Sequence, residues 1–581
     1  MAKLSVDQQT VLGLLTDKGA NFLIPDYQRP YAWGEIECQT LWEDIFDFAF
    51  PNQNRDEFNE EDDEYFLGPV VMFKNENSQK EIIDGQQRLT TILLLLRAFY
   101  LRLANMRDGA SIETRKNIGR CIWKTRRFDD NVDTSKLKID SEVATDEDKD
   151  EFLDILRTGK VSDSQKSQYA KNYRFFLQKL QDLSDNWPGY FTYLPDRLLN
   201  NCFFLPIEAE SQDTALRIFS TLNDRGKPLA DTDIFKAQFY KYYKEKGEKK
   251  EFINRWKDLE VISNEYFTSL SGTPMDELFS RYMYFERAKA GIKSTTTEAL
   301  RKFYERNKYA ILKKDDTLGN LEALAKFWKN VTLQDDTIFS DRVLKKLSVL
   351  QYAPNGMWTY LTSVYFLQNR DANDTLNDED FYKFLNKITA FIWGYSFVRP
   401  GVNALRVPAY PEMISIVGGN EVEFKDSKLD ATEVRNAMEN YSFTNNRPIT
   451  KSMLVWWAYQ NDKQNLIPTD TILETEHIYS RNRQKIERSL SDTRNMESLG
   501  NKAILERSVN IRASDYKFED KKKYYKGFTT STGKTKPETM VQELKDLADS
   551  KDDFTEQDIV DRKKKILDSF IQYLADEKLL K

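Results

Sequence analysis

The chain has 581 residues, of which 40% are hydrophobic and 31% are charged, a balance typical of globular proteins with several domains and a substantial core. The formal net charge of −7 excludes a uniformly basic surface, so nucleic-acid binding would need local basic patches. Three isolated cysteines form no Cys-x-x-Cys pair, which excludes a zinc ribbon and favours the reducing cytoplasm: Cys38, Cys121 and Cys202. The apolar run Ile92–Leu96 ends at Arg97, and no uncharged run approaches the roughly 18 residues of a membrane span.

The first 33 residues predict a helix, a strand and a stiff loop. The apolar spacing over 6–18 favours an amphipathic helix, and 21–24 favours a strand that ends at a proline. Acidic side chains in this region argue against a signal peptide. In the loop 24–33, two prolines within six residues exclude regular structure. We expect its aromatic side chains in the core, with Gln28 and Arg29 facing a site. A purely packed turn is the alternative.

A second candidate site follows a predicted hairpin of strands 66–74 and 80–83. The next residues open an apolar helix that runs to about residue 103: Asp84, Gly85, Gln86, Gln87 and Arg88. The unpaired N–H groups of a helix start bind anions, the glycine gives access to the backbone, and the side chains add donors. A nucleotide phosphate is the expected occupant. An ordinary helix capped by Asp84 is the alternative, and residue chemistry alone does not choose between them.

The stretch 219–229 predicts a helix end, a glycine cap and a proline turn before a new helix capped by Asp231. Such a turn could close over a bound nucleotide, with Asn223 and Lys236 as donors.

Residues 130–200 and 250–460 predict helices rich in aromatic residues, with a hinge at 391–401, and residues 555–580 predict a closing amphipathic helix. Three basic stretches are candidate patches for nucleic acid, although each is more often a solvated helix face: 115–127, 241–250 and 521–526.

The only histidine of the chain, His477, lies in the stretch 471–480. A neutral imidazole is well suited to accept a proton near pH 7. Glu476 precedes it, and Asn501 and Asn510 follow, which together supply a base, an orienting amide and oxygen ligands for a hard divalent cation. An ordinary packed histidine is the alternative.

The run Glu-His-Ile, then Leu-Gly-Asn, then Asn resembles the HNH, or ββα-metal, nuclease module at the C-terminal end of GmrSD-type modification-dependent (type IV) restriction enzymes. The resemblance implies that His477 is the general base and that Asn501 holds its imidazole. Glu476 and Asn510 would ligate one Mg²⁺ or Mn²⁺ ion. Asp515 stands where the family usually has Asn, and it is a further candidate ligand.

The loop Pro-x-Tyr-Gln-Arg-x-Tyr-x-Trp and the block Ile-Asp-Gly-Gln-Gln-Arg-Leu-Thr resemble the N-terminal ParB-like NTPase domain of the GmrSD, BrxU and SspE group. The stretch 219–229 agrees with that domain. The resemblance implies that a nucleoside triphosphate binds at these residues: Gln28, Arg29, Asp84, Gly85, Gln86, Gln87, Arg88, Asn223 and Lys236.

We therefore predict a mostly helical α+β protein with a ParB-like α/β NTPase domain (1–245), a helical middle domain (246–440) and an HNH nuclease domain (441–581). Its predicted function is nucleotide-regulated, metal-dependent cleavage of modified double-stranded phage DNA in antiviral defence, with no membrane contact. Which NTP is used and whether the protein is a homodimer stay open. The alternatives are an HNH nuclease acting on RNA or unmodified DNA, and a nucleotide-binding DNA adaptor whose nuclease module is vestigial.

Overall fold

The computed structural model divides into two compact units, Met1–Lys257 and Asp258–Lys581, each described by itself below. It describes residues 5–6, 8–17, 19–126, 131–143, 146–212, 214–216, 218, 231–269, 272–296, 298–401 and 403–581. The predicted class, a mostly helical α+β protein, is confirmed. Over the described ranges, no helix is long and apolar enough to cross a membrane.

The first unit is built on a mixed sheet that has seven strands within the described residues. Six follow the order β1-β9-β4-β5-β3-β8, and β2 pairs with β9. β3 is parallel to β5 and β8, and β4 is parallel to β9 but antiparallel to β5. The strands are β1 (Ser5–Val6), β2 (Gln9–Thr10), β3 (Phe22–Ile24), β4 (Tyr65–Lys74), β5 (Lys80–Asp84), β8 (Ile139–Ser141) and β9 (Cys202–Ala209). The predicted hairpin of residues 66–74 and 80–83 is thus confirmed as β4 and β5.

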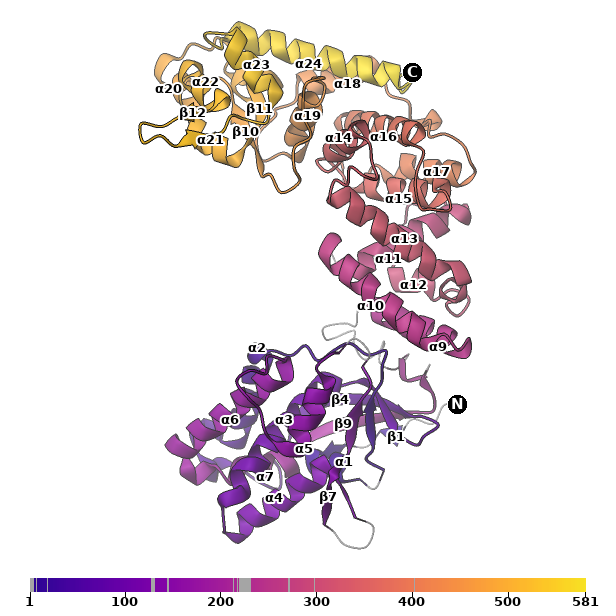
Figure 1. Cartoon of the computed structure of the whole chain (residues 1–581), viewed down its shortest axis with the longest axis vertical. Coiled ribbons are helices and arrows are strands. Elements are labelled where there is room, and N and C mark those ends of the chain that lie inside the picture. The colour runs from indigo at the N-terminus through magenta and orange to yellow at the C-terminus, as the bar shows by residue number, and fades with distance from the viewer. Residues whose placement is uncertain are drawn as a thin grey trace. The chain divides into compact units, whose positions relative to one another are not determined.

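Helix α3 (Gln86–Arg102) is the buried axis of this unit, and it packs against α4 and α6 (Figure 1). Its run from Ile92 to Leu96 is at most 1% exposed, and each such side chain stabilises the fold by roughly 1.5–3 kcal/mol. The other elements are α1 (Val11–Thr16), α2 (Glu35–Ala49), α4 (Gly109–Ile122), β6 (Trp123–Thr125), β7 (Val132–Leu137), α5 (Lys149–Thr158), α6 (Gln168–Asn186) and α7 (Tyr193–Asn200).

Two sequence predictions for this unit need correction. The helix expected over 6–18 begins only at Val11, because Gln9 and Thr10 pair with β9 and the Thr10 hydroxyl caps the helix by accepting the N–H of Gly13 (3.0 Å). The segment 130–200, expected to be helical, also contains β7 and β8. β8 is a short strand that pairs with the sequence-distant β3, so its local pattern carries little signal, whereas β7 pairs with the preceding strand β6.

Helices α9 (Asp231–Glu245) and α10 (Lys249–Tyr266) follow the first unit's sheet, and α10 continues into the second unit. Asp26, buried in the loop after β3, accepts a hydrogen bond from the hydroxyl of Tyr240 (2.8 Å) and pairs with the ammonium of Lys249. The loop that follows β3 is therefore fixed to both helices.

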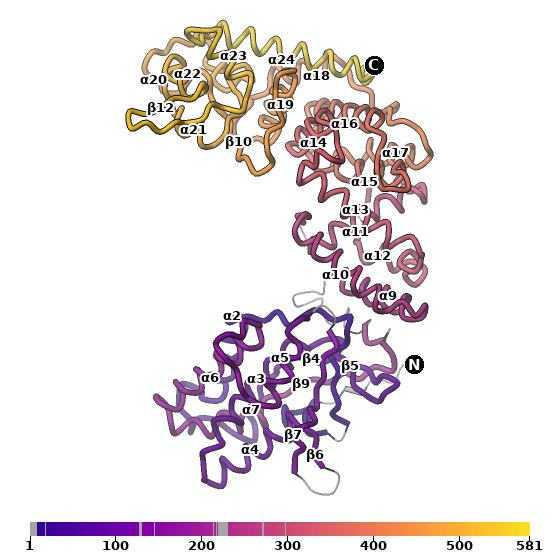
Figure 2. The backbone as a smooth tube through the Cα atoms, in the orientation of Figure 1, coloured from indigo at the N-terminus to yellow at the C-terminus, as the bar shows by residue number. Residues whose placement is uncertain are grey.

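The second unit begins with a helical part in which α11 packs against α13, α15 and α17 (Figure 2). Its helices are α11 (Pro274–Lys289), α12 (Leu300–Tyr304), α13 (Asp315–Thr332), α14 (Asp341–Leu350), α15 (Met357–Asn369), α16 (Asp378–Val398) and α17 (Arg406–Val417). The hinge expected at 391–401 is wrong for residues 391–398, which continue α16 because Phe391, Ile392 and Trp393 are fully buried.

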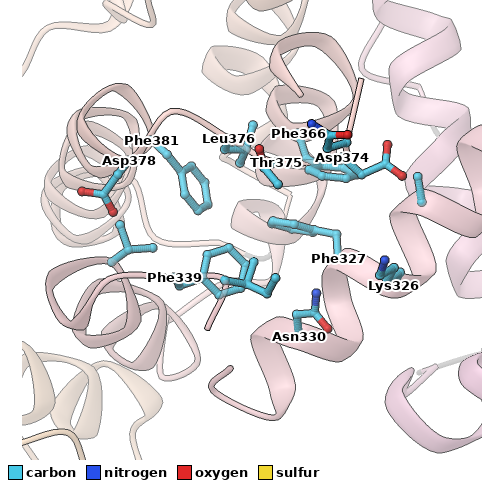
Figure 3. A pocket seen from close by; sticks show the side chains of 14 residues that line it. Lys326, Phe327, Asn330, Phe339, Phe366, Asp374, Thr375, Leu376, Asp378 and Phe381 are labelled. Carbon is cyan, nitrogen blue, oxygen red and sulfur yellow. The ribbon is translucent and has the colours of Figure 1, made fainter. Parts of the chain in front are cut away.

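A small pocket of about 60 Å³ lies among the helices of this part (Figure 3). Phe327, Phe339, Phe366 and Phe381 line it, with Asp378 at its edge. Ligand pockets usually measure about 300–1,000 Å³, so this one is a packing gap between helices and too small for a nucleotide.

The C-terminal part of the unit places β10 antiparallel to β11, and the chain passes from β11 directly into α21. Its elements are α18 (Ala431–Glu439), α19 (Pro448–Ala458), β10 (Leu473–His477), α20 (Arg481–Glu487), β11 (Lys502–Glu506), α21 (Arg507–Ala513), α22 (Phe518–Lys526), β12 (Phe528–Thr529), β13 (Thr535–Lys536), α23 (Gln542–Ser550) and α24 (Glu556–Asp576). The last of these confirms the predicted closing helix.

Helix α24 supports the turn that leads into β11. The guanidinium of Arg562 donates to the carbonyls of Leu499 (2.9 Å), Gly500 (3.1 Å) and Lys502 (2.8 Å). A Cβ at Gly500 would lie 1.9 Å from the carbonyl oxygen of Ile559, so only glycine allows this approach.

Candidate active site

His477 is the last residue of β10 and lies opposite Lys502 of β11. Its side chain is buried, and Nε2 is 3.5 Å from Oε1 of Glu497, with a geometry that does not make a hydrogen bond. Burial, together with the charges of Lys502 and Arg481, lowers the pKa of His477 to about 4. The imidazole is therefore neutral at pH 7 and keeps a lone pair that can accept a proton.

Glu497 connects His477 to two cations. Its Oε1 accepts a hydrogen bond from Nη2 of Arg481 (2.8 Å), and its Oε2 accepts one from Nζ of the fully buried Lys502 (2.5 Å). Burial raises the pKa of Glu497, but the hydrogen bonds from Lys502 and Arg481 outweigh it and hold that pKa below its usual value. A charged carboxylate thus stands beside the imidazole in a fixed position.

Glu497, Lys502 and Arg481 are absent from the sequence-based prediction. The signal for Lys502 was available once the two strands were paired, because it is the cross-strand neighbour of His477. No comparable signal exists for Glu497, which reaches the site from the 3-10 helix Thr493–Glu497.

Glu497 also lines a cavity of about 640 Å³ at the surface of the second unit, between α18, α24 and the 3-10 helix. The cavity has a mixed lining of basic, acidic and amide side chains, which includes Arg494, Asn495 and Lys563. Its volume is in the range of ligand pockets, so space for a bound group exists next to the carboxylate that contacts His477.

Asn501 is completely buried and contacts the backbone that follows His477. Its Oδ1 accepts the N–H of Tyr479 (2.7 Å), and its Nδ2 donates to the carbonyls of Tyr479 (3.1 Å) and Met496 (3.1 Å). The structure therefore places Asn501 on the main chain beyond the histidine, where it fixes the turn, and places Glu497 at the imidazole.

Glu476 lies on the opposite face of β10 from His477, as the alternation of a strand requires. Its Oε1 accepts hydrogen bonds from Nζ of Lys521 (2.7 Å) and from the hydroxyl of Tyr525 (2.7 Å), both on α22. Burial raises the pKa of Glu476, although Lys521 acts against that rise. Lys521 also donates to the carbonyl of His477 (2.6 Å), so this buried cluster supports the end of the strand.

Asn510 and Asp515 are hydrogen-bonded to two different residues. Nδ2 of Asn510 donates to Oε2 of Glu474 (2.7 Å), and Oδ1 of Asp515 accepts the backbone N–H of Arg481 (3.1 Å). In the described part of the chain, no three His, Cys, Asp or Glu side chains come together as metal ligands. As these side chains stand, they do not fit the ligand set expected for Mg²⁺ or Mn²⁺.

The start of α3 forms the second candidate site. Gly85 caps the helix with φ 89°, and a Cβ there would lie 3.1 Å from the carbonyl oxygen of Pro69 and 3.0 Å from Cγ2 of Val70. Only glycine allows β4 to pass so close to the helix start. A helix thus starts at Gln86 as expected, but Gly85, Gln86 and Gln87 are buried there.

The three glutamines predicted to bind the nucleotide connect the loop 24–33 to β5 and to the start of α3. Gln87 accepts the N–H groups of Ala32 (2.7 Å) and Trp33 (3.3 Å), and it donates to the carbonyl of Pro30 (3.1 Å). Gln28 donates to the carbonyls of Ile82 (3.3 Å) and Ile83 (3.2 Å), and Gln86 donates to that of Arg29 (3.2 Å). These side chains bring the loop and the helix start together, and most of their hydrogen-bonding capacity serves that purpose.

The charged residues Asp84, Arg88 and Arg29 lie near the start of α3. The guanidinium of Arg88 lies over Gly68, where a Cβ would be 2.4 Å from Nη1, and it makes one long hydrogen bond to the carbonyl of Pro69 (3.4 Å). Arg29 is exposed. Burial raises the pKa of Asp84, although the N–H of Gly85 and the charges of Arg88 and Arg29 oppose the rise.

Lys236 and Asn223 are the other two residues predicted to donate hydrogen bonds to the nucleotide. Lys236 is buried on α9 with its Nζ 5.9 Å from the centre of the Trp256 ring. Asn223 lies outside the described residues.

One segment near each end of the chain matches a restriction endonuclease domain. Residues 11–240 match the GmrSD restriction endonuclease, N-terminal domain, and residues 429–569 match the GmrSD restriction endonucleases, C-terminal domain. Both matched segments are thus domains of a restriction endonuclease, a class of enzyme whose substrate is DNA. The chain belongs to the GmrSD restriction endonuclease family, as its sequence motifs predict. No curated protein matches it.

Proposed function

We propose that the protein is a nucleotide-regulated endonuclease that cuts modified phage DNA, with His477 as its general base. One observation carries the proposal: the only histidine of the chain is neutral, buried and next to a charged carboxylate in a segment that matches a restriction endonuclease domain. The order β10, β11, α21 is the order of an HNH module, and we propose that these elements form it.

In this proposal Glu497 orients the imidazole. Since Nε2 is buried against Glu497, we assign the proton to Nε2 and proton acceptance from the attacking water to Nδ1. Asn501 has a positioning role, because it fixes the main chain at Tyr479 just beyond the base. Arg481 is half exposed beside Glu497 and can contact the scissile phosphate.

Membership of a nuclease family suggests a divalent metal. The arrangement of Glu476, Asn510 and Asp515 does not provide its ligands, and no step described above depends on one.

We further propose that the start of α3 binds the phosphates of a nucleoside triphosphate. The support is the N-terminal end of a 17-residue helix, a left-handed glycine and the nearby guanidinium groups of Arg88 and Arg29. Because the loop that carries Arg29 is fixed to α10 through Asp26 and Lys249, we propose that nucleotide binding shifts α10. Coupling requires the nucleotide to bind one position of α10 more tightly than the other.

The test is cleavage of a panel of modified and unmodified phage genomes, and of RNA, with each NTP and with Mg²⁺ or Mn²⁺. The proposal predicts cutting of modified DNA that depends on one nucleotide and is lost in His477→Ala. Equal cutting of RNA or of unmodified DNA would instead support a nuclease without modification dependence. Binding of nucleotide and DNA without any cutting would support an adaptor.

A further inference from the structure

Helix α20 begins four residues after His477 and is fixed to the protein along one side. The guanidinium of Arg483 forms two hydrogen bonds to the carboxylate of Asp553 (2.6 and 2.8 Å) and lies over the ring of Tyr479 (4.7 Å). Oε1 of Gln484 accepts the N–H of Leu490 (3.0 Å). The helix is therefore a rigid element whose other side is free to meet a partner.

That other side is basic. Arg481 and Lys485 are four residues apart on α20 and therefore share one face of the helix, Arg488 is the left-handed residue that ends the helix, and all three are exposed. The side chains of Lys485 and Arg488 make no hydrogen bond or ion pair within the described residues. We call these three residues the α20 stripe.

The one acid of α20 does not neutralise the stripe. Glu487 is hydrogen-bonded to Lys517 and to Nε of Arg483 (2.8 Å), and these bonds lower its pKa to about 2. Both partners lie outside the stripe, so the charges of Lys485 and Arg488 are left to the solvent or to an anionic ligand, whereas Arg481 is hydrogen-bonded to Glu497.

We propose that the α20 stripe binds backbone phosphates of duplex DNA next to the phosphate that is cut. The inference rests on the proposed function, since it takes His477 as the cleavage site. Within α20 the stripe runs from Arg481 to Lys485, about 6 Å of helix, which is close to the rise of about two nucleotides of B-DNA, and Arg488 extends it past the helix end. Cations at this spacing can neutralise two or three consecutive phosphates and place the strand against His477.

The test measures DNA binding by the full chain as a function of salt concentration. The parent protein is His477→Ala, which is expected not to cut, and the probe is a duplex of a modified phage genome fragment. The test variant adds Lys485→Gln and Arg488→Gln. The matched control adds Lys293→Gln and Lys302→Gln, which remove the same charge from exposed positions of the same unit. Melting temperatures show that all three proteins are folded.

Each phosphate contact contributes about 0.9 to the slope of log affinity against log salt, so the test variant should lose about 1.8 from the slope. Between 50 and 200 mM salt, the affinity of the parent should then fall roughly tenfold more than that of the variant. The control should keep the slope of the parent. An unchanged slope in the folded test variant would overturn the proposal that the α20 stripe binds DNA and would leave the proposed function standing. Absence of DNA binding by the parent would contradict both the stripe and the proposed function.

Discussion

The ammonium group of Lys521 lies 2.7 Å from Oε1 of Glu476, and both side chains are almost completely buried. The same ammonium donates to the carbonyl of His477, so the pair connects α22 to the residue at the centre of the candidate site. Removing one partner of a buried ion pair costs about 3–5 kcal/mol, because the other charge is left uncompensated.

Glu476→Ala should therefore lower the free energy of unfolding by about 3–5 kcal/mol, measured by urea denaturation. The double variant Glu476→Gln, Lys521→Met should recover part of the loss. Glu474→Ala is the matched control, since Glu474 lies on the same strand face but is one-third exposed, and its loss should cost about 1 kcal/mol or less. If Glu476→Ala kept full stability and lost only a bound metal, the structural role of the pair would be contradicted.

The pKa of His477 should be far below that of an ordinary histidine. Because it is about 4 in the folded chain and 6.5 for an unperturbed imidazole, the unfolded chain takes up the proton first. The stabilising contribution is complete above about pH 6.5 and is lost as the pH falls toward 4, up to about 3 kcal/mol. Wild-type stability should fall more steeply over this window than that of His477→Ala.

Arg481→Gln should raise the pKa of His477, because it removes one of the positive charges that lower it. Since the chain has a single histidine, an NMR titration of imidazole-labelled protein reports this one group. A wild-type pKa near 6.5 would show that the imidazole is solvated and not held in the buried site.

At the start of α3, we expect Arg88 to bind the nucleotide and Gln87 to stabilise the fold. Arg88→Ala should abolish or strongly weaken nucleotide binding and leave the fold intact, because its guanidinium makes one long hydrogen bond in the protein. Gln87→Ala should instead destabilise the fold by about 1–3 kcal/mol, because it leaves the N–H groups of the loop unpaired. Calorimetric nucleotide titration and thermal melting separate the two effects. Normal nucleotide affinity in folded Arg88→Ala would remove this site from the account.

Replacing Gly500 or Gly319 by alanine should change the stability of the protein in opposite directions. Gly500→Ala should prevent the close approach of α24, since the new Cβ would meet the carbonyl oxygen of Ile559 at 1.9 Å. We expect a loss of several kcal/mol or failure to fold. Gly319→Ala, inside α13 with no atom within 4 Å of its Cβ position, should stabilise by up to about 1 kcal/mol. Equal melting temperatures for the two variants would contradict the described packing.

The sequence predicted the elements whose signal is local. The apolar stretch 66–74 and the apolar run after Arg88 correspond to β4 and α3, and the amphipathic closing helix corresponds to α24. Motif residues also identified the family. Such signals lie within a few turns of chain, where periodicity and turn chemistry determine the structure.

The contacts of the candidate site depend on tertiary placement, and the sequence did not reveal them. Asn501 was expected at the imidazole. The register of β10 and β11 instead places Lys502 opposite His477, and the side chain of Asn501 bonds to the main chain at Tyr479, just after the histidine. Whether Glu476 faces a metal or an ammonium depends on where α22 packs, about 45 residues further along the chain. Glu497 reaches the histidine from a short 3-10 helix that has no sequence signature.

The most direct test of the central claim is DNA cleavage by His477→Ala, with Thr475→Ala on the same strand face as the control. General-base catalysis contributes roughly 10² to 10⁴ in rate, so His477→Ala should lose cleavage by at least that order while Thr475→Ala keeps it. Circular dichroism and nucleotide binding should be unchanged in both proteins. A folded His477→Ala protein that cuts modified DNA at the wild-type rate would contradict the assignment of His477 as the general base.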